Sequence, residues 1–221
     1  MEPLGSFLAH HAPSFQHVAI AGQRWDVLRA LLEGLPRERA ERGLRVAEIG
    51  VEKGMTVSYL MRHVPAIAEY VLVDPYELPG KSPESNAVLE GYFQNIRAWS
   101  ATAPSFQRGG QQVVRQLRLT SEEAAGKVES DYFDLVFIDG EHSFEAVRRD
   151  IQVWKRRVRP DGGILAGHDF SIFHVAAALA VVVECGPASE DAGRFPLRSA
   201  SGRPLVHLSA DSVWWVAREP T

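Results

Sequence analysis

The chain has 221 residues, 45% of them hydrophobic, which suffices for one large globular domain with a sizeable core. Its formal net charge of −4 argues against a general nucleic-acid or membrane-surface binder, since such proteins carry an excess of Lys and Arg. The single cysteine, Cys185, excludes an intramolecular disulfide and a cysteine-rich zinc site. The beginning of the sequence lacks the pattern of a signal peptide, and no apolar stretch is long enough to span a membrane. We therefore expect a cytoplasmic protein with neither a nucleic acid nor a membrane as partner.

Helix-like and strand-like segments alternate along most of the chain, which is typical of an α/β fold with a mainly parallel sheet. Strands are predicted at residues 44–48, 70–74, 113–119, 133–138 and 164–167. Helices are predicted at residues 14–35, 54–64, 86–100, 121–127, 143–158 and 171–184. Residues 205–209 and 212–217 form two strand-like runs joined by a short turn, which predicts a C-terminal β-hairpin.

A glycine-containing turn follows the first predicted strand of this alternating region. Its pattern is Glu48-x-Gly50-x-x-x-Gly54, and a helix begins directly after it. Glycine permits a tight turn and lets a ligand lie against bare backbone. A dinucleotide-binding turn would have a second glycine where this chain has Glu52, and a carboxylate there would repel a pyrophosphate. The turn therefore suits a cationic ligand such as the sulfonium and α-amino groups of S-adenosylmethionine.

An acidic residue, Asp74, stands at the end of the next strand, 24 positions after Gly50. In folds of this type, an acid at that place accepts hydrogen bonds from ribose hydroxyls. A two-glycine turn alone would equally suit a plain strand-to-helix connection. The two strand ends together favour a nucleoside-binding site.

Three segments resemble a known family: VAEIGVEKGMT, VLVDPYE and DLVFIDGEHSFEAVRRDIQVWKRRVRPDGGILAGHDF. They are similar to class I S-adenosylmethionine-dependent methyltransferases of the small-molecule O-methyltransferase type, in particular the macrocin O-methyltransferase and cephalosporin-hydroxylase-like group. The resemblance covers about residues 45–170. It implies a Rossmann-like, seven-stranded, mainly parallel sheet with a C-terminal antiparallel hairpin and helices on both faces. With it we expect an N-terminal helical cap at residues 1–43 and a methyltransferase domain at residues 44–221, within one globular unit.

The resemblance also implies a set of cofactor-binding residues. Glu48, Gly50 and Gly54 would line the methionine part of the cofactor, and Asp74 would bind its ribose. The full expected set is Glu48, Gly50, Gly54, Thr56, Asp74, Ser121, Asp139 and His142. Many relatives have an acid after the third strand, where adenine is contacted, but this chain has Thr120 and Ser121 there and no acid before Glu122.

Polar side chains that can carry chemistry follow two strands that should be neighbours. Asp139 and His142 follow one strand, and His168 and Asp169 follow the other. Ligands in open α/β sheets bind beyond such strand ends, so these groups can converge. We expect the catalytic residues to be Asp139, His142 and His168.

Two routes could activate a hydroxyl for methyl transfer. A divalent metal held by Asp139, His168 and Asp169 could bind the oxygen and lower its pKa. Magnesium prefers oxygen ligands, so a histidine would suit manganese, iron or zinc better. A histidine with an ordinary pKa of about 6.5 could instead act as general base without any metal.

Two other functions remain open at this stage. The chain could be a non-catalytic S-adenosylmethionine-binding scaffold, or an NAD(P)-dependent oxidoreductase, although Glu52 argues against the latter.

Adjacent tryptophans in the last strand, Trp214 and Trp215, would point to opposite faces, so one could cover a neighbouring helix or support a homodimer.

Overall fold

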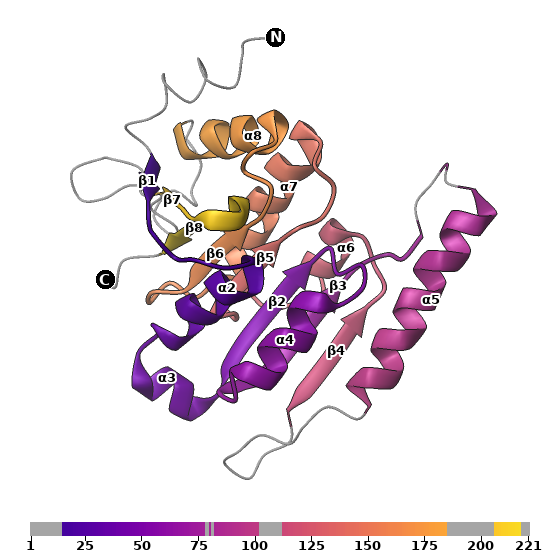
Figure 1. The fold of residues 1–221 in the computed structure, drawn as a ribbon, viewed down its shortest axis with the longest axis horizontal. Helices are drawn as coiled ribbons and strands as arrows, with labels where there is room; N and C mark the ends of the chain where they lie inside the picture. Colours follow the sequence, from indigo (N-terminus) through magenta and orange to yellow (C-terminus); the bar gives the residue numbers. More distant parts are fainter. Residues whose placement is uncertain (1–14, 78–79, 81, 102–111, 185–205, 218–221) are drawn as a thin grey trace.

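The computed structural model describes residues 15–77, 80, 82–101, 112–184 and 206–217. These residues form one eight-stranded sheet with helices on both faces (Figure 1). The strands, in chain order, are β1 Phe15–His17, β2 Leu44–Ile49, β3 Ile67–Val73, β4 Val113–Leu117, β5 Leu135–Ile138, β6 Ile164–Gly167, β7 Val206–Leu208 and β8 Trp214–Ala217. The helices are α2 Arg24–Glu33, α3 Arg37–Arg42, α4 Met55–His63, α5 Pro83–Ser100, α6 Ser121–Ala125, α7 Phe144–Trp154 and α8 Phe173–Glu184, with 3-10 turns at Lys155–Arg157 and Ala210–Ser212.

The strand order is β1-β7-β8-β6-β5-β2-β3-β4. Strand β2 pairs in parallel with both β3 and β5, so the order of the sheet reverses beside β2. Strand β8 runs antiparallel between β6 and β7. The predicted Rossmann-like fold with its reversed C-terminal strand is confirmed, and its reversal point is where such sheets bind ligands.

Two apolar layers hold the helices to the sheet. Consecutive residues of a strand face opposite sides, so Val46 packs with the cluster under α2 and α4 while Ala47 packs with the cluster under α7 and α8. Both residues are fully buried. Strands β5 and β6 are unbroken apolar runs, as expected of parallel strands covered on both faces.

The predicted helix at residues 14–35 is wrong in its first part. Residues Phe15–His17 form β1, which pairs in parallel with β7, and α2 begins only at Arg24. Gly22 has φ +113°, a backbone conformation that interrupts a helix. The partner of β1 lies about 190 residues away, so local periodicity could not reveal the strand, and the sheet has eight strands instead of seven.

Other differences concern element ends. Helix α5 starts at Pro83, earlier than predicted, because the Ser82 hydroxyl accepts the Ser85 N–H and proline is favoured in a first helical turn. Helix α3, after Pro36, was not predicted. Cys185 lies outside the described residues.

The C-terminal pair β7–β8 is joined by a 3-10 turn. Trp214 and Trp215 are both buried, and Trp215 stacks on His207 at a ring-centroid distance of 5.2 Å. Neither tryptophan offers an exposed aromatic surface, so a homodimer stays a prediction without support from these side chains.

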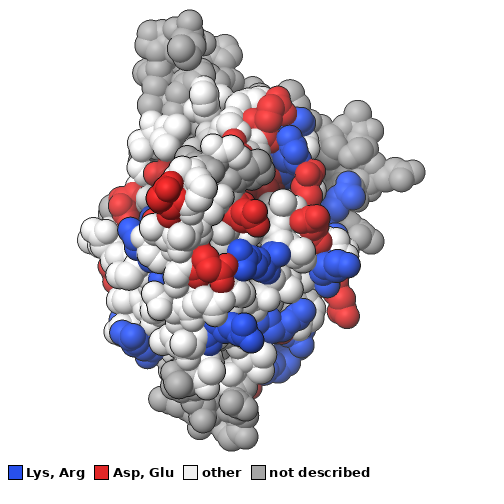
Figure 2. All heavy atoms as spheres, turned by 90° about the vertical axis from the view of Figure 1, so that its right-hand side faces the viewer, with Lys and Arg blue, Asp and Glu red and all other residues white. Residues whose placement is uncertain are grey.

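The surface carries both signs of charge on the face shown in Figure 2. Acidic side chains lie mainly in the upper half of that view and basic side chains mainly across its middle and lower part. Among the described residues, no helix is both long and apolar enough to cross a membrane.

The contact between β6 and β8 gives a stability prediction. A Cβ at Gly167 would overlap the indole ring of Trp214, which is fully buried. We expect Gly167→Ala to lower the free energy of unfolding by about 1–3 kcal/mol through overpacking, measured by urea denaturation. Gly91→Ala, in helix α5 with open space around the added methyl, is the control, and should be neutral or stabilising by up to about 1 kcal/mol. Equal effects of the two changes would contradict the packing argument.

Candidate cofactor-binding and active site

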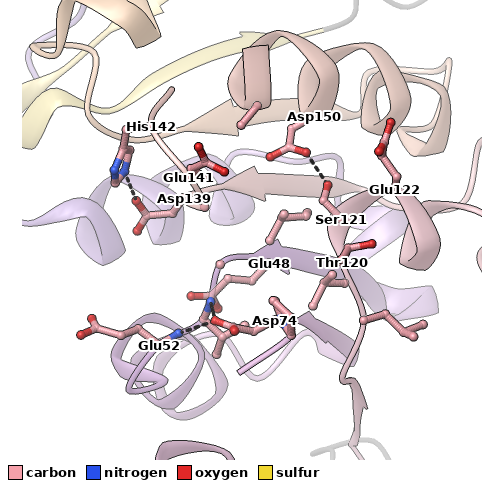
Figure 3. Close-up of a pocket in the computed structure, with 18 of the residues that line it drawn as sticks. Glu48, Glu52, Asp74, Thr120, Ser121, Glu122, Asp139, Glu141, His142 and Asp150 are labelled. Carbon is pink, nitrogen blue, oxygen red and sulfur yellow. Dashed lines mark hydrogen bonds and ion pairs between the residues drawn. The ribbon is translucent and has the colours of Figure 1, made fainter. Parts of the chain in front are cut away.

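A cleft of about 1530 Å³ opens beyond the carboxyl ends of the parallel strands. Its walls come from the turns after β2, β3, β4, β5 and β6, and from the start of α2 (Figure 3). The residues expected to bind cofactor lie together in this wall: Glu48, Gly50, Thr56, Asp74, Ser121, Asp139 and His142. Gly54, the other residue of that set, stands at the start of α4 below the turn.

The turn after β2 needs its two glycines. Gly50 has φ +84°, and a Cβ there would overlap the backbone carbonyl of Asp139. Gly54 has φ +72°, and a Cβ would lie 2.9 Å from the Ile96 side chain. Glycine at position 50 lets the end of β2 pass directly beside the end of β5, and glycine at position 54 lets the start of α4 pack against α5.

Asp74 holds this turn in place. Its Oδ2 accepts the backbone N–H groups of Val51 at 2.9 Å and Glu52 at 3.0 Å. Its Oδ1 accepts the N–H of Tyr76 at 2.8 Å. A carboxylate oxygen has two lone pairs, so Oδ1 can accept a further donor. The predicted ribose contact stays a prediction, and the structure adds that the same carboxylate orders the glycine turn.

Glu48 is a buried acid at the floor of the cleft. It is only 2% exposed, and its Oε2 accepts the Tyr70 hydroxyl at 2.9 Å. Burial first, and the charge of Asp139 to a smaller extent, raise the pKa of Glu48 to about 8 against the opposing effect of the Tyr70 hydrogen bond. Thr56, also buried, lies close enough to favour the charged form. A cationic ligand beside Glu48 would favour the charged form much more strongly.

The acids and histidines after β5 and β6 do converge. One ligand atom each from Asp139, His168 and Asp169 lie within 4.8 Å of one another. His142 Nε2 lies 2.7 Å from Asp169 Oδ2 and 3.9 Å from Asp139 Oδ1. These two carboxylates, Asp139 first, raise the pKa of His142, against the effect of its partial burial.

His168 lies deeper than His142. Its Nδ1 is 3.3 Å from Asp169 Oδ1 and 3.6 Å from Asp139 Oδ1, and its side chain is 11% exposed against 43% for His142. Neither ring nitrogen of His168 has a hydrogen-bond partner within the described part of the chain. Of the two histidines, His142 is the one that a ligand in the cleft can reach.

Two residues of this cluster were missed by the sequence analysis. Arg24, the first residue of α2, lies with Nη1 3.4 Å from Asp139 Oδ2. Its backbone N–H donates to Asp211 Oδ2 at 2.6 Å, and the same Asp211 oxygen lies 3.6 Å from His168 Nε2. Nothing in the local sequence of either residue signals this role, since they stand near opposite ends of the chain.

The predicted metal ligands can be tested against their surroundings. Two carboxylates and an imidazole are a donor set for a transition-metal ion. However, Arg24 already neutralises Asp139 and His142 already pairs with Asp169. These partners reduce the attraction of the cluster for a cation, but they contact Asp139 Oδ2 and Asp169 Oδ2. His168 Nδ1 faces the other two oxygens, Asp139 Oδ1 and Asp169 Oδ1, so the donor set stays open and the metal stays a prediction.

A family model described as "Methyltransferase domain" matches residues 47–170, from the glycine turn to the end of the Asp169 segment. No curated protein matches the chain. A solved structure of a protein from Corynebacterium glutamicum is similar with a TM-score of 0.54 and 12% identity, covering 99% of this chain and 88% of that one.

Two further solved structures are similar. One is monomeric WbdD, with a TM-score of 0.51, 14% identity, and coverage of 90% of this chain and 42% of that one. The other is cofactor-bound Rv0187 from MTB, with a TM-score of 0.48, 18% identity, and coverage of 100% and 92%. At such identities the two structures with TM-scores above 0.5 support the fold alone. The family model, by contrast, spans more than half of the chain and contains the cleft residues that follow strands β2 to β6. The chain belongs to the methyltransferase domain family and is a class I S-adenosylmethionine-dependent methyltransferase.

Proposed function

We propose that the protein transfers the methyl group of S-adenosylmethionine to a hydroxyl oxygen of a small molecule, with His142 as general base. The observation that carries the proposal is the His142–Asp169 pair, 2.7 Å apart, at the mouth of the cleft beside Asp139. S-adenosylmethionine supplies an electrophilic methyl group on a sulfonium. The remaining requirement is a nucleophile that has lost its proton.

The cofactor would lie along the glycine turn. Glu48 would face the positive charge of its methionine part, with the backbone of Gly50 against it. Asp74 would face the ribose, and the turn that contains Ser121 would face the adenine. This orientation directs the methyl group toward the acid and histidine cluster after β5 and β6.

A hydroxyl needs a base because even a phenol has a pKa of about 10. When His142 Nε2–H donates to Asp169, its Nδ1 is the free acceptor. The hydroxyl proton passes to Nδ1, the oxygen bonds to the methyl carbon, and the sulfur keeps the electron pair of the broken C–S bond. The products are the methyl ether and S-adenosylhomocysteine. The charges of Asp139 and Asp169 stabilise the imidazolium that forms.

His168 would act by position instead of by proton transfer. Its side chain is only 11% exposed and lies 3.3–3.6 Å from carboxylate oxygens of Asp139, Asp169 and Asp211. Two of these carboxylates, Asp139 and Asp169, also flank His142.

The second candidate function is a non-catalytic scaffold that binds the cofactor. Membership of the methyltransferase family leaves no reason to keep the nicotinamide alternative.

The test is methyl transfer from isotope-labelled S-adenosylmethionine to a panel of phenols, sugars and alcohols. We expect His142→Gln to lower kcat by about 10²–10⁴-fold, the usual contribution of a general base, with a much smaller loss of cofactor affinity. His63→Gln is the control, because His63 is exposed at the end of α4 and lies outside the cleft wall.

Three results would count against the proposal. Full activity of His142→Gln would remove the general base. Cofactor binding without turnover on any acceptor would favour the scaffold. Loss of activity on chelation, restored by Mn²⁺, would favour the metal route over the metal-free one.

Glu48 gives a pH prediction for cofactor binding. The carboxyl must ionise to pair with the cation, so affinity for S-adenosylmethionine should rise by up to about tenfold per pH unit from pH 7 to 8 and level off above it. Calorimetry in two buffers at pH 7 should show proton release on binding. Glu48→Gln should weaken binding and flatten the profile, whereas Glu52→Gln, an exposed acid on the same turn, should leave the profile unchanged.

The same raised pKa affects the free protein. The folded state holds the Glu48 proton more tightly than the unfolded chain, whose pKa is ordinary. This contribution to stability is complete at acidic pH and is lost as the pH rises through about 8. Glu48→Gln should therefore be less sensitive than the parent to unfolding at pH 9 in the absence of cofactor. If the parent protein neither releases a proton on cofactor binding nor loses stability above about pH 8, Glu48 is not a buried, protonated acid.

A further inference from the structure

A second buried acid, Asp150, lies in the cleft wall at the end opposite to the histidine cluster. Helix α7 carries it, and it is 6% exposed. Figure 3 shows it pointing from α7 toward Ser121, in the turn after β4. Helices α6 and α7 pack together here, so an acid from α7 reaches the turn after β4 at Thr120 and Ser121, before the first acid of that segment, Glu122.

Asp150 is held by a chain of two hydrogen bonds. The indole Nε1–H of Trp154 donates to Ser121 Oγ at 2.9 Å, and the Ser121 hydroxyl donates to Asp150 Oδ1 at 2.5 Å. Trp154 is fully buried. Because the indole can only donate, it directs the hydroxyl proton of Ser121 toward Asp150.

The other carboxylate oxygen is left for a ligand. Among the described residues, Ser121 is the one hydrogen-bond donor to the Asp150 carboxylate. Oδ2 lies beside the backbone of Gly140, 3.7 Å from where a Cβ on that residue would stand. Gly140, Ser121 and Asp150 all line the cleft. Asp150 keeps 6% of its surface exposed where it lines the cleft, so its second carboxylate oxygen is available to a ligand N–H.

The surroundings suit one edge of a flat heteroaromatic ring. The apolar side chains of Leu119 and Ala146 line the same end of the cleft as the bare backbone of Gly140. Burial raises the pKa of Asp150 to about 6, against the effect of the Ser121 hydrogen bond; Arg149 also lowers it, while Glu122 and Glu141 raise it. The carboxylate is therefore mainly ionised at neutral pH and can only accept.

We propose that Asp150, positioned by Ser121 and Trp154, accepts a hydrogen bond from the 6-amino group of the cofactor's adenine and so selects adenine over 6-oxopurines. The inference rests on the cofactor placement of the proposed function and not on the identity of the methyl acceptor. Asp150 supplies from α7 the acid that is absent at Thr120 and Ser121. A 6-oxopurine would present its own acceptor to the carboxylate, and the two would repel each other.

The experiment compares two ligands by calorimetry on the full chain at pH 7.5: S-adenosylhomocysteine and S-inosylhomocysteine, which has a 6-oxo group. We expect the parent to prefer the adenosine compound by at least about 30-fold, the usual weight of a hydrogen bond to a charged group. Asp150→Asn should reduce this ratio to within about threefold, because an amide can either accept or donate. Glu145→Gln, an exposed acid on α7 that pairs with Arg148, is the matched control and should keep the parent ratio.

Ser121→Ala provides a second variant if Asp150→Asn does not fold. It removes the hydroxyl that orients Asp150, so the preference should fall several-fold while the carboxylate remains. A parent that binds both ligands equally would overturn the assignment and leave the cofactor placement intact. In Asp150→Asn, both affinities could fall together while the ratio of adenosine to inosine compound stays unchanged. This result would show that Asp150 only supports the turn, and it would also overturn the assignment. Failure of the parent to bind either ligand would overturn the cofactor placement itself.

Discussion

The close approach of the ends of β2 and β5 is the constraint on which the rest of the site depends. The Asp139 N–H donates to the Ile49 carbonyl at 2.7 Å, and directly after it the backbone of Gly50 passes beside the Asp139 carbonyl with no room for a side chain. This contact brings Glu48, at the end of β2, and Asp139, directly after β5, to the same junction. Asp74 then ties the following backbone N–H groups to the end of β3. The position of this junction therefore sets where the residues proposed to contact the cofactor lie.

Two buried carboxylates line the cleft, Glu48 at its floor and Asp150 in its wall, and they have different expected roles. Glu48 has a pKa near 8, so it is largely neutral until a cation arrives, and its ionisation couples binding to pH. Asp150 has a pKa near 6 and is largely ionised at neutral pH, which suits a fixed hydrogen-bond acceptor. Burial raises both values, and the difference in use follows from what each carboxylate would face: a positive charge in one case and a neutral amino group in the other.

The acid and histidine cluster of the cleft receives residues from both ends of the sequence. Arg24 and Asp211 are joined by a hydrogen bond, and each approaches a member of the cluster, Asp139 and His168 respectively. The strand pairing of β1 with β7 brings these regions together. Because Arg24 compensates the charge of Asp139, the cluster carries its own counter-ions, which is the physical basis for preferring a histidine base to a bound metal.

The sequence by itself determined strands β2 to β8, the reversed final strand and most of the expected cofactor residues that line the cleft. These features produce local signals in the sequence, namely alternating apolar segments and the spacing of Glu48, Gly50 and Asp74. The signals are local because a strand end, a turn and a helix start each depend on residues that are consecutive in the sequence. The convergence of Asp139, His142, His168 and Asp169 followed from one rule, that neighbouring parallel strands end at the same edge.

Only the tertiary structure decided the remaining features. Strand β1 depends on a partner at the other end of the chain, and at three residues it is too short to be recognised alone. The Arg24–Asp139 and Ser121–Asp150 contacts join residues 115 and 29 positions apart, so no periodicity connects them. Asp150 in sequence is one polar residue on an amphipathic helix. Its burial beside Ser121 and Trp154 depends on how α7 packs over the turn after β4, and that packing is a property of the folded chain.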